Sequence, residues 1–133
     1  MLKLSDRYHT EQVARMWTSY VANGNGFALH ALHTSTCSLL TVYQTLAADL
    51  DICDTRALSL GLRPLPIPEA ALGIDIDDMA ANIAIAYNIA SNSNGAREYD
   101  HAQQLAMHAE TMAAAVDALC RLRNDYSIYL QRD

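Results

Sequence analysis

Apolar residues recur every three or four positions in four segments of this chain, which is the spacing of one face of an α-helix. Turn-forming residues separate the segments. Residues 23–26 (Asn-Gly-Asn-Gly) and 91–95 (Ser-Asn-Ser-Asn-Gly) end the first and third segments, since glycine and asparagine readily adopt the left-handed conformation that closes a helix. Residues 63–68 carry prolines at alternate positions, which keep them extended. The pattern therefore predicts four helices, two on each side of a proline-rich linker.

The first two predicted helices form an αα-hairpin over residues 5–61. The first helix begins at a cap on Ser5 or Asp6. The second covers residues 27–50, and a short helical turn over residues 54–61 follows it and stops at a glycine. The apolar stripe of the first helix consists of Val13, Met16, Trp17, Tyr20 and Val21.

The last two predicted helices form a second hairpin over residues 75–132. The third helix opens on three aspartates, which favour the positive end of the helix dipole. Residues 79–96 carry no formal charge and have apolar side chains on two faces, so burial nearly all round is expected. The fourth helix, residues 97–131, has two apolar bands and one arc expected to face solvent. That arc consists of Gln103, Glu110, Asp117 and Arg121.

Neither hairpin has an adequate core of its own, so residues 1–133 are expected to form a single domain. The linker between the hairpins covers residues 62–74. The predicted fold is all-α, a bundle of the four-helix type made of two αα-hairpins. Its surplus of apolar and uncharged surface predicts a dimer or a bound partner.

Charge is missing from a long central stretch of the chain. No Asp, Glu, Lys or Arg occurs in the 33 residues from Met16 to Ala48, where about six would be expected at the chain's average of 18%. Soluble proteins place charged residues at roughly a quarter to a third of their surface positions. The second helix therefore has a neutral polar face that is expected to be buried against a partner. The residues predicted to bind this partner are Tyr20, His30, His33, Cys37, Thr41 and Tyr43.

Composition narrows the choice of partner and compartment. A net charge of −6, with no cluster of Lys or Arg, makes nucleic acid and anionic membrane surfaces poor partners. The candidate membrane span, residues 79–91, is too short to cross a bilayer. The three cysteines form no C-x-x-C pair, and the chain does not begin with the apolar run of a signal peptide. We expect a cytoplasmic protein without a cofactor.

Histidines suggest a metal site as an alternative. The pattern His30-x-x-His33-x-x-x-Cys37 places three ligand types along one helical face within about two turns. Glu98-x-x-His101 has the i, i+3 spacing of di-iron bundle ligands, but the chain has no second such pair. The ligands of a metal-binding enzyme or sensor would be His30, His33, Glu98, His101 and His108.

Three functions follow from these patterns. The leading one is a small non-enzymatic regulatory or adaptor protein, which binds and masks another protein through its uncharged helical faces, as anti-activators, immunity proteins and chaperones do. Catalytic motifs such as G-x-S-x-G or a phosphate-binding glycine loop are absent from the sequence. The alternatives are the metal-binding bundle and a structural subunit of a larger assembly, which would need the same buried faces.

Overall fold

The computed structural model describes residues 8–23, 26–92 and 96–131, with side chains described from Tyr99 onward in the last range. The predicted all-helical fold is confirmed for these residues, which contain four packed α-helices and no strand. The elements are α1 (Tyr8–Asn23), α2 (Gly26–Ser59), the 3-10 turn η2 (Glu69–Ala71), α3 (Ile76–Asn92) and α4 (Ala96–Tyr129).

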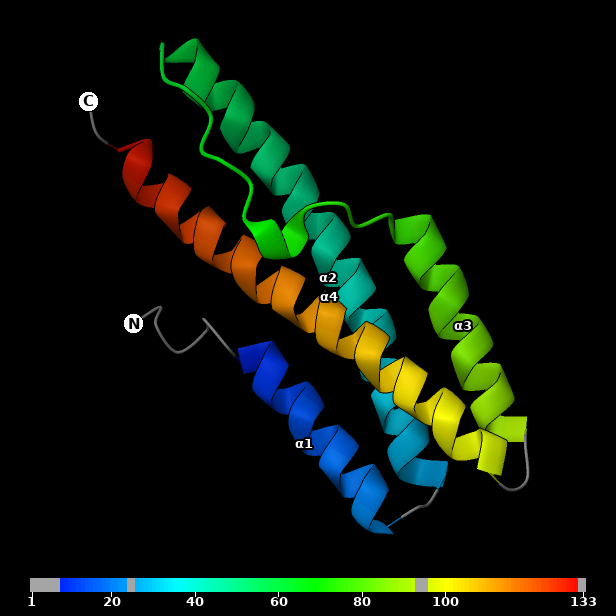
Figure 1. Ribbon diagram of the computed structural model, residues 1–133. Helices are drawn as coiled ribbons and strands as arrows, with labels where there is room; N and C mark the ends of the chain where they lie inside the picture. Colours follow the sequence, from blue (N-terminus) through cyan, green and yellow to red (C-terminus); the bar gives the residue numbers. More distant parts are fainter. Residues whose placement is uncertain (1–7, 24–25, 93–95, 132–133) are drawn as a thin grey trace.

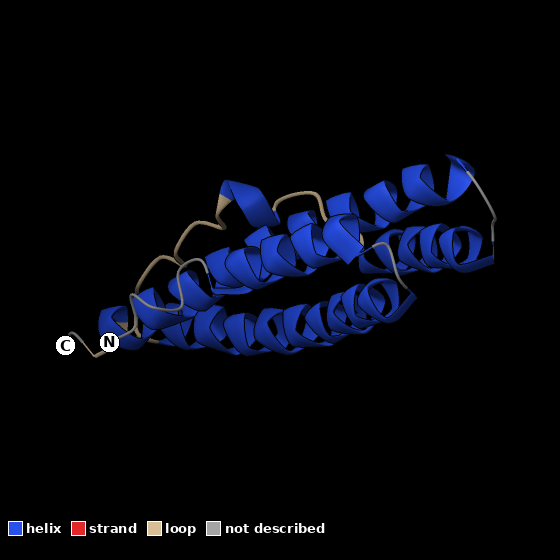
Figure 2. Ribbon diagram, turned by 90° about the horizontal axis from the view of Figure 1, so that it is seen from below, coloured by secondary structure: helices blue, strands red, loops and turns tan. Residues whose placement is uncertain are grey.

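Two helices of 34 residues each, α2 and α4, form the centre of the bundle. They run side by side in the same direction, while the shorter α1 and α3 run the opposite way on either side of them (Figure 1). The α2–α4 contact is the most extensive, and α1 and α3 each pack against both long helices but, within the described residues, not against each other. Seen from below, all four helices lie roughly along one long axis (Figure 2).

The core is continuous along α4. Alanines on this helix are fully buried beside larger side chains, so the neighbouring helices approach it closely. One buried cluster lies where α1, α2 and α3 surround α4, and a second lies between the carboxyl-terminal halves of α2 and α4. The largest fully buried apolar side chains are Tyr126, Leu32, Ile83, Leu105, Met112 and Val116.

Helix α2 is longer than the sequence pattern predicts. The expected end near Leu50 is wrong, because the helix continues without a break to Ser59. Its last turns bury Leu50 and Ala57 against the second cluster, which holds them helical. The predicted stop at Gly61 is confirmed, because this residue follows the last turn of α2 and has a φ of 78°. The amide of Leu62 donates to the carbonyl of Ala57 at 2.8 Å, and this bond closes a Schellman motif.

The proline-rich residues 62–68, which we call the strap, run back over the second cluster as an extended segment. Leu62 and Leu65 pack against this cluster, and η2 follows the strap. Asp75 then caps α3, since its carboxylate accepts the amide N–H of Asp78 at 3.1 Å.

Helix α3 is less buried than predicted. Burial nearly all round is wrong, because only Ile83, Ala86 and Ala90 are buried and Ile85 is 56% exposed. The physical reason is its position at the side of the bundle, where only α2 and α4 contact it among the helices. Its outward face therefore stays in solvent although residues 79–92 carry no formal charge.

Candidate functional site

The outward surface of α2 between Phe27 and Ala48 is exposed and carries no formal charge. We call this surface the neutral face. The helix is stable there because its opposite side lies in the core. On the exposed side, the hydroxyl of Thr41 donates to the carbonyl of Cys37 at 3.5 Å. The exposed side chains of the neutral face are Phe27, His30, Ala31, Thr34, Cys37, Ser38, Thr41, Val42, Gln44, Thr45 and Ala48.

The predicted partner-binding residues divide into two groups. His30, Cys37 and Thr41 are exposed on the neutral face, and half-buried His33 lies at its edge toward α3. Tyr20, by contrast, lies in the core and is only 6% exposed. Tyr43 also faces inward, where it packs against both buried clusters and donates its hydroxyl to the carbonyl of Ala71 at 3.5 Å. Only the first group is available to a partner on the surface of the bundle.

The side chains of His30, His33 and Cys37 form a cluster with Tyr87 of α3. The His33 ring stacks on the Tyr87 ring, with centroids 3.9 Å apart and planes inclined by 6°. His30 Nδ1 lies 3.2 Å from the Tyr87 hydroxyl. On the other side, Cys37 Sγ lies 3.5 Å from His33 Nε2. The sequence pattern identified the three α2 residues but not Tyr87, because its position depends on packing between helices.

Partial burial favours the neutral forms of two members of this cluster, the His33 imidazole and the Cys37 thiol. Burial lowers the pKa of His33, and the nearby His30 lowers it further. Burial also raises the pKa of the Cys37 thiol. A reactive cysteine needs the thiolate form, which these surroundings disfavour. The arrangement is suited to neutral hydrogen bonding and to ligation, in which a bound cation displaces the thiol proton.

The larger histidine site expected from the sequence is not assembled within the described residues. No group of three or more His, Cys, Asp or Glu side chains among them is placed to hold a metal ion. His108 is half-buried on α4, where burial lowers its pKa, and His101 is also half-buried on that helix. The side chain of Glu98 lies outside the described residues.

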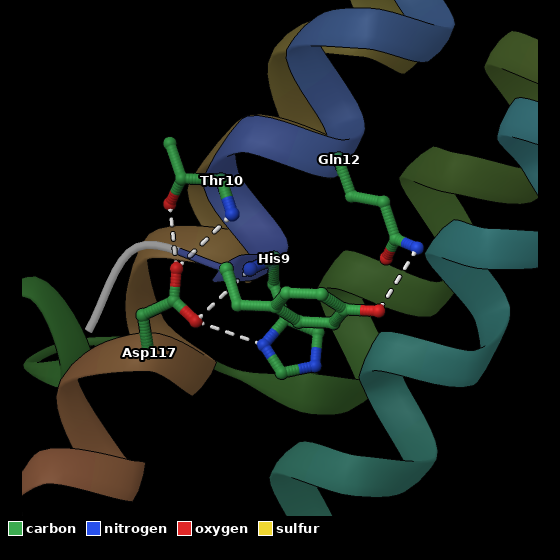
Figure 3. Close-up of polar contacts among 5 residues, drawn as sticks. His9, Thr10, Gln12 and Asp117 are labelled. Atoms are coloured by element: carbon green, nitrogen blue, oxygen red, sulfur yellow. Dashed lines mark hydrogen bonds and ion pairs between the residues drawn. The ribbon is translucent and has the colours of Figure 1, made fainter. Parts of the chain in front are cut away.

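A buried carboxylate joins α4 to the beginning of α1 (Figure 3). Asp117 is 2% exposed and accepts four hydrogen bonds. Its Oδ1 accepts the backbone N–H of His9 at 3.2 Å and the His9 ring Nδ1 at 2.8 Å. Its Oδ2 accepts the backbone N–H and the hydroxyl of Thr10 at 3.0 and 2.9 Å. A side chain from the middle of one helix thus caps the amino-terminal end of another.

The expectation that Asp117 faces solvent is wrong. The helical period placed it with Glu110 on the solvated arc, but α1 covers that position. One signal in the sequence does point to burial, because its immediate neighbours Val116 and Ala118 and its i−4 neighbour Ala113 are all apolar. A single acid among such residues needs donors from another element.

The His9 ring also borders a groove between α1 and α2. Ser35 and Ser38 of α2 line the same groove, whose volume is about 240 Å³. Within the described residues no hydrogen bond joins the ring to either serine. The nucleophile-to-base contact of a serine hydrolase is therefore not formed, and the His9–Asp117 pair works here as a clamp between helices.

Tyr126 and Tyr129 fix the strap to α4. The Tyr126 hydroxyl donates to the Asp54 carboxylate and accepts the amide N–H of Leu65 at 2.7 Å. Burial and the bond to Asp54 raise the pKa of Tyr126 to about 12. The Tyr129 hydroxyl donates to the carbonyl of Arg63 at 2.8 Å. The strap is thereby held by side-chain bonds as well as by its leucines.

Helices α2 and α4, at 34 residues each, have the length to cross a bilayer. In the part of the chain that the structure describes, however, no helix combines that length with sufficient apolar character. Comparison of the chain with protein-family models, with curated proteins and with solved structures finds no match in any of the three.

Proposed function

We propose that this chain is a small non-enzymatic regulatory or adaptor protein that acts by protein–protein binding through the neutral face of α2. The observation that carries the proposal is the exposed face of α2 between residues 27 and 48, which has no formal charge in a chain whose net charge is −6. Within the described residues the outward side of α3 is also uncharged over residues 79–92, but the uncharged stretch of α2 is the longer of the two.

Burial of the neutral face carries a small desolvation penalty. Removing an ionised side chain from water costs several kcal/mol unless it is paired, whereas a neutral hydroxyl or imidazole needs only a hydrogen-bond partner. Thr41 already has such a partner in the carbonyl of Cys37. Protein interfaces are likewise depleted of charge at their centres. The face supports binding for this reason even though it is not strongly apolar.

The neutral face is also preformed. Leu29, Leu32 and Leu39 project from the opposite side of α2 into the first core cluster. A partner would therefore meet a helix already fixed in place and would not have to order it, which preserves binding free energy. Phe27, which is 87% exposed at the beginning of α2, and Val42 supply apolar contact area.

The class of partner follows from charge. An acidic surface repels phosphate backbones and anionic lipid, so we infer a protein partner, or a second copy of this chain, in the cytoplasm. The mode of action is masking, in which the neutral face covers an exposed patch on the partner, as anti-activators, immunity proteins and chaperones do.

The test is a single charge placed at the centre of the neutral face. Thr41→Arg should leave the helix content unchanged, because Arg is a better helix former than Thr. It should weaken self-association, measured by light scattering, and partner capture, measured by cross-linking in cells of the source. Gln104→Arg adds the same charge at an exposed position of α4 and serves as the matched control. Equal binding by both variants and the unmodified chain would overturn the proposal.

A further inference from the structure

One side chain on the neutral face and one at its edge have the separation of metal ligands. His33 and Cys37 lie one helical turn apart, with Nε2 and Sγ separated by 3.5 Å. Zinc binds imidazole nitrogen at about 2.0–2.1 Å and thiolate sulfur at about 2.3 Å, usually with tetrahedral angles. Those bond lengths and angles place the two ligand atoms about 3.5 Å apart. The pair therefore matches the separation required at a tetrahedral zinc ion.

We propose that His33 and Cys37 form half of a zinc site that the same two residues of a second copy of this chain complete. One tetrahedral ion with two imidazole and two thiolate ligands would then join two neutral faces. This inference rests on the proposed function, in which the neutral face binds a partner. It identifies that partner as a second copy of this chain.

Packing against α3 holds the ligand geometry in place. The His33 ring is stacked on Tyr87, whose hydroxyl lies within hydrogen-bond distance of His30 Nδ1. The stack limits rotation of the His33 ring and keeps its Nε2 beside Cys37 Sγ. Ligands fixed in this way lose less conformational freedom when a metal binds.

The described residues of one chain do not complete the site. A structural zinc ion takes four protein ligands. Among the described residues, no other His, Cys, Asp or Glu is placed to bind the same ion as His33 and Cys37. A two-fold axis beside Cys37 would supply the missing imidazole and thiolate, because an isologous interface repeats the same residues on both sides.

The surroundings of His33 and Cys37 permit two copies of the chain to come together there. Two chains with a net charge of −6 each repel one another, but the repulsion is smallest where neither surface carries charge. Thr34, Ser38 and Thr41 border the pair on the exposed side of α2 and are small, so two α2 helices can approach closely there.

Binding requires no oxidant or reductant. Each Cys37 thiol loses its proton to solvent and its sulfur forms a bond to the zinc ion, while each neutral His33 donates its Nε2 lone pair. Two protons are released for each ion that joins two chains, and the charge of the ion is balanced by two thiolates.

The experiment adds zinc chloride to the chelator-treated full chain and measures bound metal and subunit number by native mass spectrometry. One zinc ion per two chains is expected, with a shift from monomer to dimer in light scattering. Cobalt in place of zinc should give thiolate charge-transfer absorption. Cys37→Ser and His33→Gln should each abolish the metal-bound dimer. Cys53→Ser and His108→Gln remove a half-buried thiol and a half-buried imidazole elsewhere and should retain it.

Three results would overturn the proposal. The first is a bound ion in a chain that stays monomeric, and the second is a metal-bound dimer that survives Cys37→Ser. A dimer that forms equally well after chelation would also exclude the metal bridge, but it would leave the neutral face as a binding surface. Loss of association in Thr41→Arg then tests that surface separately.

Discussion

Asp117 of α4 contacts His9 of α1 at two points, the backbone N–H and the ring Nδ1, through a single carboxylate oxygen. The second oxygen bonds Thr10 in the same double manner. Two amide N–H groups in the first turn of α1 are therefore satisfied by a residue more than 100 positions away in the chain. This arrangement makes the packing of α1 depend on one buried side chain.

Replacement of this side chain should destabilise the fold. In Asp117→Ala the buried donors of His9 and Thr10 lose their acceptor, which we expect to lower the free energy of unfolding by roughly 2 to 4 kcal/mol. The loss occurs even though Ala is the better helix former. Urea denaturation followed by circular dichroism measures the change.

The matched control is Glu110→Ala, which removes an exposed carboxylate from the same helix. Its effect should stay within about 0.5 kcal/mol. If the two variants unfold at the same urea concentration, the carboxylate of Asp117 does not hold α1 in the way its hydrogen bonds indicate.

The sequence predicts those parts of the fold that depend on local chemistry. The end of α1 at Asn23, the stop at Gly61 and the capping role of the acids at the start of α3 depend on residues close in the chain. The end of α2 and the exposure of α3 could not be predicted in the same way. Both depend on how many neighbouring helices cover a given face, which a single helical period does not encode.

The same distinction applies to the candidate site. The i, i+3 and i+4 spacing correctly placed His30, His33 and Cys37 along one face of α2. Tyr20 belongs to the apolar stripe of the first helix, and the structure places it in the core with Val13, whereas Val21 of the same stripe is 50% exposed. The stacking partner Tyr87 comes from another helix, so no pattern within residues 27–50 could identify it.

The left-handed backbone at Gly61 gives a second prediction. Open space surrounds the position of a Cβ at both Gly61 and Gly26, but only Gly61 has a positive φ. Gly61→Ala should therefore lower the free energy of unfolding by about 1 kcal/mol through backbone strain alone. Gly26→Ala, at the start of the same helix, should leave stability unchanged or slightly higher. Thermal denaturation of both variants checks this, and equal midpoints would contradict it.

The bond between Tyr126 and the strap predicts how the stability of the fold depends on pH. Tyr126 is 1% exposed, and its phenol is neutral while it donates to Asp54 and accepts from Leu65. Because its pKa rises from the ordinary 10.0 to about 12 on folding, the folded chain favours the protonated phenol. The resulting stabilisation is fully present below about pH 10 and is lost as the pH rises toward about 12.

The two-unit rise corresponds to about 2 to 3 kcal/mol of stabilisation, since each unit corresponds to about 1.4 kcal/mol. Tyr126→Phe should be less stable than the unmodified chain at neutral pH, and the difference should shrink between about pH 10 and pH 12. Urea denaturation at a series of pH values measures this difference directly. Tyr99→Phe removes an exposed hydroxyl and should cost little at neutral pH. A difference between Tyr126→Phe and the unmodified chain that stays constant across this range would show that the phenol does not favour its protonated form on folding.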